Sequence, residues 1–450
     1  MPEIGLTPYQ VGFNILNTII GSGIIGLPYA IKEAGFWFGM LLLIAVGILC
    51  KTALEILILC GEKLNSFDFG ANLEKTAGKS GRHLLNFALC INGFGSCITY
   101  LMISTDIMYP VLFPLTPTKY QVFLTRTNLM LLISAVFVLP LLFFKNLDPL
   151  SRFSTFSILL VPTVILILVL RAPTYFVSIP PLKIIGGNPV PAIGIIAFAM
   201  VCTQTSYQNY KGLRGPSPIK DWETASKFAI KFAVSVYTSF SLLGYLIFGM
   251  NSQPNILNNF AKDDAGANLA RVLMAISIIL TYPMQFYPTR EILNSIIHLK
   301  LGKRSYQNTL DSARNEGLFS PSPAELEETS ANSPNLLDNA LSLVWFGSTV
   351  IVSILVTDLG VVYKLLGALS ASLLAFILPS WMYLSMNSSY FNPEYPTESS
   401  QLIQQSQTLP RVLSRNNLDR NPEYFTVVSK FMFALGVFVL VIGTINTVLY

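Results

Sequence analysis

FNILNTIIGSGIIGLPY, residues 13–29, is an apolar run of membrane-helix character that carries glycine at positions 21, 23 and 26. Gly21 and Gly23 each cost about 1 kcal/mol in a helix relative to alanine, and with Ser22 between them they favour local unwinding. Unwound main chain at mid-membrane depth is tolerated only where it is buried in protein or lines a cavity. Its free N–H groups and the positive end of the following half-helix can bind a carboxylate. The run therefore predicts a broken helix with a carboxylate site at Gly21, Ser22 and Gly23.

Two other interpretations fit the same letters. The first is close helix packing through small residues, as in small-xxx-small motifs, and this stretch alone leaves it open. The second is a G-x-G-x-x-G nucleotide loop, which needs a preceding strand and an acidic residue about 20 positions later. Residues 38–50 contain no acid, and the motif sits inside an apolar helical run, so nucleotide binding is disfavoured.

The composition places the whole chain in a membrane. Of its 450 residues, 52% are hydrophobic and only 12% are charged, whereas soluble domains carry about 25% charged residues. The basic residues lie in loops rather than in one stripe, so no nucleic-acid partner is expected. The five cysteines lie in or beside apolar segments, which argues against a disulfide framework. The two histidines offer no metal-binding spacing.

Apolar segments long enough to cross a bilayer recur along the chain. A spanning helix needs about 20 apolar residues, and the sequence predicts about eleven such helices in an all-α, polytopic membrane protein. The predicted segments are about 10–30, 36–60, 84–113, 127–145, 153–171, 192–211, 227–249, 267–292, 339–357, 361–386 and 425–449. The ninth and tenth nearly touch at residues 357–360. Residues 1–450 are expected to form one transporter domain.

The basic residues of the loops predict the orientation. One set of alternate loops holds about 18 Lys and Arg residues and the other about 7, and the positive-inside rule makes the richer side cytoplasmic. The N-terminus is then cytoplasmic and the C-terminus lies on the opposite face, which requires an odd number of spans. Two polar stretches, about 303–338 and 388–424, fall on the cytoplasmic side. They are expected to be flexible loops, because they can bury little apolar area.

The sixth segment predicts a second broken helix. Its apolar part, residues 193–201, is too short to cross a bilayer, and the polar run CTQTSYQNY follows at 202–210. Polar side chains inside a span are costly unless they face a site; a helix that simply ends at Val201 is the alternative. Because segments one and six begin two sets of five, the pattern predicts an inverted repeat. Its halves are about 10–171 and 192–386, with an extra helix at about 425–449.

The eighth segment carries a candidate cation site. Ser277 and Thr281 lie four residues apart and share a helix face, and Pro283 cannot donate a hydrogen bond to the Ile279 carbonyl. Two hydroxyls and a free carbonyl are hard oxygen ligands suited to a small cation. The alternative is ordinary hydroxyl bonding back to the helix.

Four acidic residues in or beside the predicted spans bear on function, and of these Glu33, near the mouth of the first segment, is expected to be solvated. Glu55 follows Lys51 by four residues, so the two charges should neutralise each other. Asp106 and Asp358 are candidates for coupling roles, because an acid within the membrane is usually functional. Either could instead reach an interface with water.

Five blocks carry a family resemblance. They are FNILNTIIGSGIIGLPYAIKEAGF at 13–36, FAMVC at 198–202, GYLIFG at 244–249, ILTYPMQFYPTREIL at 279–293 and GALSASLLAFILPSWMYL at 367–384. They resemble the amino acid/auxin permease family, and within it the sodium-coupled neutral amino acid transporter branch. The resemblance implies a leucine-transporter-like fold of eleven helices that carries amino acids, with sodium associated with Asn17 and Thr281. Thr203 and Gln204 stand where many relatives carry histidine, so pH sensitivity of that type is not expected.

The predicted function is secondary active transport of small, neutral L-amino acids by alternating access with sodium, and not an enzymatic reaction. Sodium is expected at Asn17, Ser277 and Thr281, and the substrate carboxylate at the first break. The other substrate contacts are expected from segments three and six, at Asn92, Ser96, Phe198, Cys202 and Thr203. Two rivals stay open: proton-driven transport in a vacuolar or endolysosomal membrane, and an amino acid sensor without net transport. The sequence predicts neither the membrane nor the oligomeric state.

Overall fold

The computed structural model describes residues 6–142, 148–213, 218–300, 336–387 and 422–449. Within these residues the regular structure is helical, apart from one isolated β-bridge between Leu6 and Leu213. The predicted all-α class is therefore confirmed for the described part of the chain. Most of the two predicted flexible loops lies outside it. Their described ends, 336–338 and 422–424, belong to helices.

The helices follow one another in a single series. In chain order they are α1 Pro8–Ile19, η1 Ser22–Gly26, α2 Leu27–Ala34, α3 Phe36–Leu64, α4 Phe69–Leu115, α5 Thr118–Gln121, α6 Arg126–Ile133, η2 Ser134–Val138, α7 Leu139–Leu141, α8 Asp148–Tyr175, α9 Pro189–Met200, η3 Thr203–Thr205, α10 Ser206–Lys211, α11 Pro218–Phe248, η4 Gly249–Asn251, η5 Ile256–Asn259, α12 Ala265–Lys300, α15 Leu336–Leu355, α16 Leu359–Leu366, η6 Gly367–Ile377, α17 Leu378–Met386 and α19 Pro422–Leu449. Of the η elements, η2 and η6 are π-helical and the others are 3₁₀ turns.

All eleven predicted segments coincide with helices. Among the described residues, seven helices are long and apolar enough to cross a membrane, and the bent pair of α1 with η1 and α2 makes eight. The other three predicted segments correspond to shorter apolar helices at Arg126–Leu141, Pro162–Tyr175 and Asn339–Leu355. The positions of the segments are thus confirmed as helical, whereas the number of eleven spans stays a prediction.

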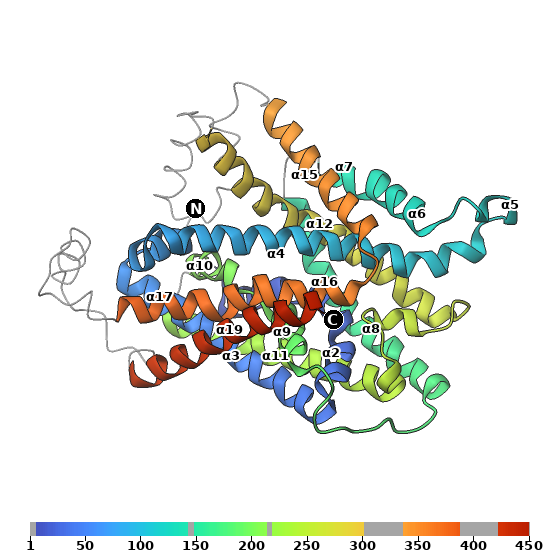
Figure 1. The fold of residues 1–450 in the computed structure, drawn as a ribbon, viewed down its shortest axis with the longest axis horizontal. Coiled ribbons are helices and arrows are strands. Elements are labelled where there is room, and N and C mark those ends of the chain that lie inside the picture. The colour runs from blue at the N-terminus through green and yellow to red at the C-terminus, as the bar shows by residue number, and fades with distance from the viewer. Residues whose placement is uncertain (1–5, 143–147, 214–217, 301–335, 388–421, 450) are drawn as a thin grey trace, which may run out of the picture.

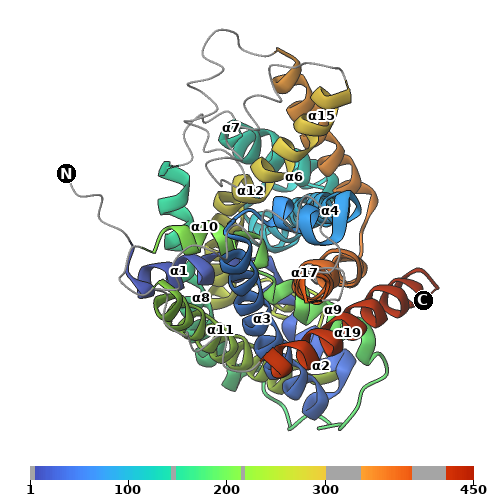
Figure 2. The same ribbon diagram turned by 90° about the vertical axis from the view of Figure 1, so that its left-hand side faces the viewer.

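Helix α4 forms the long axis of the molecule (Figure 1). It packs against α12 on one side and against η6 and α17 on the other. Helix α9 lies in the interior, in contact with α2, α3 and η6. Helix α1 runs beside α11 (Figure 2). The two short helices next to the breaks therefore pack against longer ones, α1 against α11 and α8 and α10 against α3, and α1 keeps one face exposed.

Helix α4 begins about four turns earlier than its predicted start near residue 84. Asp68 caps its first turn by accepting a hydrogen bond from the Ala71 N–H at 2.5 Å. Gly78 then adopts a φ of 72°, so two helices meet at a kink there. A positive φ is open to glycine at no steric cost. The ion pair between Glu74 and Arg82 braces the kink.

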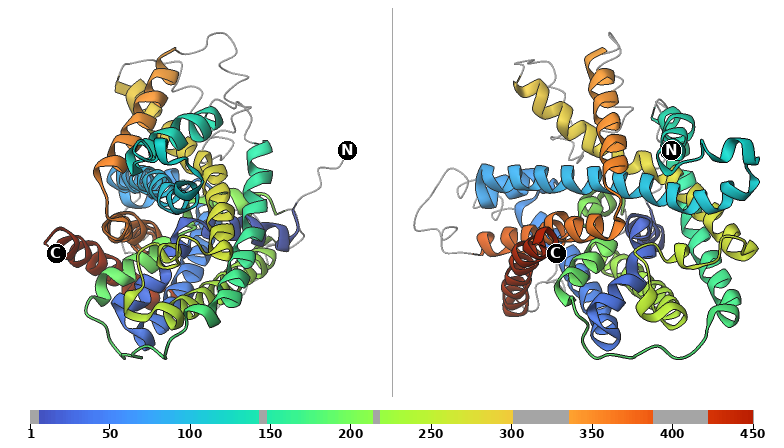
Figure 3. Two further views of the ribbon diagram at one scale, coloured as in Figure 1. Left: turned by 90° about the vertical axis from the view of Figure 1, so that its right-hand side faces the viewer. Right: turned by 45° about the vertical axis from the view of Figure 1, so that its right-hand side comes forward.

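The connection between α8 and α9, residues 176–188, runs along one edge of the molecule (Figure 3). It is fixed to the junction of α2 and α3 by main-chain hydrogen bonds, from Gly186 N–H to the Ala34 carbonyl at 2.6 Å and from Phe38 N–H to the Ile184 carbonyl at 3.1 Å. The last helix of the first predicted repeat is thereby linked to the first helices of the chain.

Candidate functional site

The first broken helix has the geometry that its glycines predict. Helix α1 ends at Ile19, and the chain bends by 54° before η1 and α2 continue. Gly21 is extended, with φ −140° and ψ −151°, and no side chain caps η1. The N–H groups of the first turn of such a helix have no acceptor inside it. Ser22 and Gly23 therefore present main-chain donors at the break.

The sixth segment is discontinuous in the same way. Helix α9 ends at Met200, Val201 and Cys202 are non-helical, and η3 and α10 follow. The polar run that follows Val201 is thus part of the broken helix, and the alternative of a plain loop is wrong. Thr203 Oγ1 donates to the Leu374 carbonyl of the π-helical element η6 at 2.8 Å.

One hydroxyl joins the two breaks. Tyr237 of α11 is fully buried, and its Oη lies 2.8 Å from the Ile19 carbonyl and 3.0 Å from the Ala199 carbonyl. Both carbonyls belong to last turns of half-helices, where no intrahelical donor remains. The hydroxyl has one hydrogen for two acceptors, so the two half-helices share it.

The two broken helices also touch directly. A Cβ on Gly23 would lie 2.7 Å from Ala199 Cα, so the first break rests on the main chain of α9. The hydroxyls of Thr18 and Thr205 lie 3.3 Å apart across the breaks. The two discontinuities thus lie at one level of the molecule.

The outer ends of α1 and α10 are joined as well. The Leu6 N–H, just before α1, donates to the Gly212 carbonyl, just after α10, at 2.9 Å. Leu6 and Leu213 form the isolated parallel bridge. The two half-helices are therefore connected both at their breaks and at their far ends.

Two tyrosines and a threonine from neighbouring helices complete the first break. Tyr363 of α16 donates to the Ser22 carbonyl at 2.8 Å, and Ser22 Oγ lies 3.3 Å from Thr99 Oγ1 of α4. Tyr100 Oη lies 3.1 Å from the position of a Cβ on Gly21. It is also within reach of the Thr281 side chain. Tyr100 therefore lies between the break and the predicted cation site.

These residues were not predicted from the sequence. Tyr100 follows the predicted contact Ser96 by one helical turn, so the face was identified but not its full extent. Tyr237 and Tyr363 stand in apolar runs of later segments, and a phenol inside such a run gave only a weak signal. Their approach to the break depends on the packing of α11 and α16.

The predicted substrate residues divide into two groups. Gly21, Ser22, Gly23, Phe198 and Cys202 lie at the two breaks; the Phe198 ring centroid is 6.0 Å from that of Tyr363. Cys202 is buried within the second break. Thr203 also lies at the second break and faces η6.

Asn92 and Ser96 lie elsewhere along α4. Asn92 accepts a hydrogen bond from Ser370 Oγ at 3.2 Å, and it lies seven residues before Thr99, which corresponds to about 10 Å of helix rise. Ser96 is one turn from Thr99 and offers its carbonyl to the Thr99 hydroxyl at 2.8 Å. Ser96 is thus the nearer of the two to the break.

The predicted cation ligands lie on two elements. Asn17 occupies the last turn of α1. Thr281 Oγ1 donates to the Ser277 carbonyl at 2.8 Å and lies 3.1 Å from the Ile278 carbonyl. Its hydrogen is thus used by bonding back to the helix, while its lone pairs remain available to a cation.

Each of the predicted intramembrane acids forms an ion pair or caps a helix. Lys51 and Glu55 form the expected ion pair. Asp106 accepts a hydrogen bond from Arg126 Nε at 2.8 Å, and Asp358 caps α16 through the Gly360 N–H at 2.7 Å.

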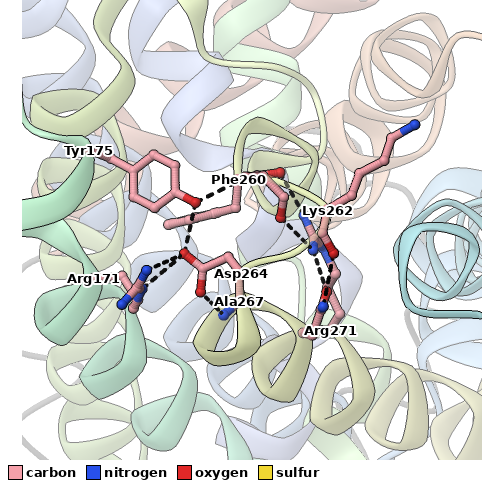
Figure 4. A network of polar contacts seen from close by, with 9 residues as sticks. Arg171, Tyr175, Phe260, Lys262, Asp264, Ala267 and Arg271 are labelled. Carbon is pink, nitrogen blue, oxygen red and sulfur yellow. Dashed lines mark hydrogen bonds and ion pairs between the residues drawn. The ribbon is translucent and has the colours of Figure 1, made fainter. Parts of the chain in front are cut away.

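The segment between η4 and α12, residues 252–264, covers the first break; we call it the capping segment. Its 3₁₀ turn η5 contacts η1 and α4. Arg271, fully buried, donates to the carbonyls of Leu257 at 2.9 Å, Phe260 at 2.8 Å and Ala261 at 3.1 Å (Figure 4). One arginine thus provides hydrogen bonds to three main-chain carbonyls of the capping segment.

Asp264 fastens the other end of the capping segment. Its carboxylate accepts hydrogen bonds from Arg171 Nη2 and Tyr175 Oη, both at 2.7 Å, and from the Ala267 N–H at 2.9 Å (Figure 4). Burial alone would raise the pKa of Asp264, but the hydrogen bonds from Ala267, Tyr175 and Arg171 outweigh it and hold the pKa below its ordinary value of 3.8.

A helical membrane bundle whose two broken helices meet around free main-chain groups is built as secondary transporters are. The chain matches the family model described as transmembrane amino acid transporter protein over residues 5–406. It belongs to this family of amino acid transporters, which are not enzymes. The family expected from the sequence blocks is thereby confirmed.

Curated relatives agree with the family. The Danio rerio protein named "Putative sodium-coupled neutral amino acid transporter 11" is 27% identical over 383 residues, covering 84% of this chain and 79% of the relative. "Vacuolar amino acid transporter 2" of Saccharomyces cerevisiae is 24% identical over 384 residues, covering 83% and 75%. The chain is therefore similar to proteins named for sodium coupling and to one named for the vacuole.

A solved structure shows the same fold. A manganese transporter of Eremococcus coleocola superposes with a TM-score of 0.51 at 13% identity, covering 98% of this chain and 94% of the other. At this identity the likeness concerns the fold alone. The predicted leucine-transporter-like fold class, with its first and sixth segments broken, is confirmed.

Proposed function

We propose that the protein is a secondary transporter of small, neutral L-amino acids that works by alternating access. The observation that carries the proposal is the meeting of two broken helices, with the N–H groups of Ser22 and Gly23 beside the end of α9. These donors and the positive end of η1 and α2 suit a carboxylate. The substrate amine and side chain then face the second break, at Phe198, Cys202 and Thr203.

The side chains at the breaks support a neutral substrate. Thr99, Tyr100, Phe198, Tyr237 and Tyr363 are all uncharged, and all are buried. A charged substrate side chain placed among them would lose its hydration without gaining a counter-ion, which is costly. We expect an uncharged side chain to be accepted for this reason.

Sodium is proposed as the coupling ion. Asn17 lies in the last turn of α1, the Thr281 hydroxyl oxygen lies on α12, and Tyr100 lies between Thr281 and Gly21. A cation bound to Asn17, Ser277 and Thr281 would stabilise the end of α1 and so order the break that receives the carboxylate. Binding of ion and substrate would then be coupled.

A proton-coupled transporter of a vacuolar or endolysosomal membrane is the second candidate. The relative of Saccharomyces cerevisiae, named as vacuolar, supports it. Under either candidate the N-terminus is proposed to be cytoplasmic and the C-terminus to lie on the opposite face.

Counterflow of radiolabelled amino acids in proteoliposomes tests the proposal, with sodium replaced by choline across a series of pH values. Sodium coupling predicts that choline abolishes concentrative uptake, and that Asn17→Ala and Thr281→Ala raise the sodium concentration needed for half-maximal uptake. Thr447→Ala is the matched control, because Thr447 makes the same back-bond, to the Gly443 carbonyl at 2.7 Å, in α19. Uptake that follows the pH gradient and ignores sodium supports the proton-coupled candidate instead. Binding of amino acids without counterflow would support a sensor.

A further inference from the structure

Four charged side chains surround Tyr29 beyond the first break. Tyr29 lies seven residues after Ser22, which places it about 10 Å further along the helix. Lys32 and Glu33 are its neighbours on α2, Asp358 caps α16, and Lys364 lies on α16. We call Tyr29 and these four residues the mouth cluster.

Both lysines lie near the Tyr29 ring, and neither has a carboxylate partner among the described residues. Lys32 Nζ lies 5.3 Å and Lys364 Nζ 5.8 Å from the centroid of the Tyr29 ring. Lys32 also donates to the Ser252 carbonyl of the capping segment at 3.4 Å. No described carboxylate lies within 4.0 Å of either ammonium group. Two positive charges near one ring, with no carboxylate beside them in the described part of the chain, would attract an anionic group.

The two acids lie at the other end of the tyrosine. Glu33 and Asp358 are the acidic neighbours of the Tyr29 hydroxyl. Gly360 marks a close approach next to it: a Cβ there would lie 3.1 Å from Asp358 Oδ1, 3.1 Å from Pro254 Cγ and 3.4 Å from Tyr29 Oη, so these groups pack closely around the glycine. Carboxylate, hydroxyl and capping segment thus meet at one point.

We propose that the mouth cluster is a second, outer binding site for the zwitterionic head of an amino acid. The lysines receive its carboxylate, and the carboxylates of Glu33 and Asp358 receive its ammonium. The inference rests on the proposed function, because the head group is that of the transported substrate. With two charges of each sign, the cluster complements a zwitterion and offers no net charge to a simple ion.

The cluster is continuous with the site at the breaks. Lys364 directly follows Tyr363, which donates to the Ser22 carbonyl. Gly26, one turn before Tyr29, packs against the Tyr363 ring, with a Cβ position 2.7 Å from Cε2. Helices α2 and α16 therefore contribute residues to both the mouth cluster and the break.

Initial rates of L-alanine and L-glutamine uptake by the full chain in proteoliposomes test the outer site. Lys364→Gln is expected to raise KM about threefold to fivefold with kcat unchanged, since a half-exposed ion pair contributes no more than about that factor. Ionic strength is varied with choline chloride at fixed sodium: KM of the wild type should rise with salt, and that of Lys364→Gln should rise less. Lys364→Arg should restore the wild-type KM.

Lys119→Gln is the matched control. Lys119 also lies over a tyrosine ring, 5.7 Å from the centroid of Tyr120, but outside the mouth cluster. It should leave KM and its salt dependence unchanged. A Lys364→Gln variant with unaltered KM contradicts the outer site. A Lys364→Gln variant with a lower kcat and an unaltered KM would mean that the charges act in gate closure, and it would also contradict the outer site. A wild type that takes up no amino acid contradicts the proposed function and the outer site together.

Discussion

Tyr237 is the residue on which the two broken helices depend jointly. Replacing it by phenylalanine removes one donor and leaves the Ile19 and Ala199 carbonyls unsatisfied in a buried place. A lost hydrogen bond of this kind costs about 1 kcal/mol, which corresponds to a transport rate about fivefold lower if the bond orders the breaks. Rates in proteoliposomes and thermal unfolding in detergent measure the two effects.

Tyr245→Phe is the control for this prediction. Tyr245 lies on the same helix and donates to the Pro181 carbonyl at 2.7 Å, away from the breaks. It should lower thermal stability to a similar extent and leave the transport rate unchanged. Equal losses of rate in both variants would show that the Tyr237 effect is general destabilisation.

Gly23 is predicted to tolerate no side chain. Gly23→Ala would place a Cβ 2.7 Å from Ala199 Cα, and overpacking of this kind costs about 1–3 kcal/mol. We expect lower thermal stability and loss of uptake. Gly347→Ala is the control, because no atom lies within 4 Å of its Cβ position, and alanine favours a helix. If Gly23→Ala transports like the wild type, the break does not rest on α9 during the cycle.

Residue-level prediction from the sequence succeeded where one residue type has one strong preference. Gly21 and Gly23 indicated a break because glycine weakens a helix wherever it stands. Tyr100, Tyr237 and Tyr363 could not be found in this way, since their role comes from three other helices that approach the break. Asn92 shows the converse: a buried amide suggested a substrate contact, and the structure gives it a partner in Ser370.

At the scale of elements, the capping segment should respond to pH through Asp264. The pKa of Asp264 is lower in the folded protein than its ordinary value of 3.8. Its stabilising effect is therefore fully present above about pH 4 and is lost as the pH falls through the folded pKa. The melting temperature should not change through this group between pH 7 and 5.

Asp264→Asn tests this assignment. At neutral pH it should lower the melting temperature by about 2–4 °C, and the difference from the wild type should shrink as the pH is lowered from 4 through the folded pKa. Asp263→Asn, at the exposed neighbouring position, should melt like the wild type at every pH. A difference that stays constant over the whole acid range would mean that Asp264 acts by packing rather than by charge.

The elements themselves were largely predictable, because length and apolarity define a membrane helix. The start of α4 was missed, since residues 69–77 form a short, largely polar helix that joins the rest of α4 through the kink at Gly78, and the apolar pattern does not include it. The π-helical geometry of η6 was also missed. It arises where Gly367 meets Gly194 so closely that a Cβ on Gly367 would lie 2.1 Å from the Gly194 carbonyl carbon.

For the whole molecule, the odd number of predicted spans puts the two termini on opposite faces. An epitope at the N-terminus should be protected from antibody in intact cells, and one at the C-terminus should be accessible. An epitope inserted at the exposed Lys119 marks the predicted non-cytoplasmic face. If both termini are accessible, or both are protected while the Lys119 epitope is accessible, the number of spans is even and one of the three shorter apolar helices does not cross.

The bond between Leu6 and Gly212 has a mechanical consequence. Helices α1 and α10 each meet the rest of their span at a break, and their other ends are connected to each other by a main-chain hydrogen bond. The breaks are also linked, through Tyr237 and through Thr18 and Thr205, so the two half-helices are connected at both ends. With connections at both ends, neither half-helix can rotate about its break without moving the other. A force applied to the chain just before α1 is therefore transmitted to both breaks.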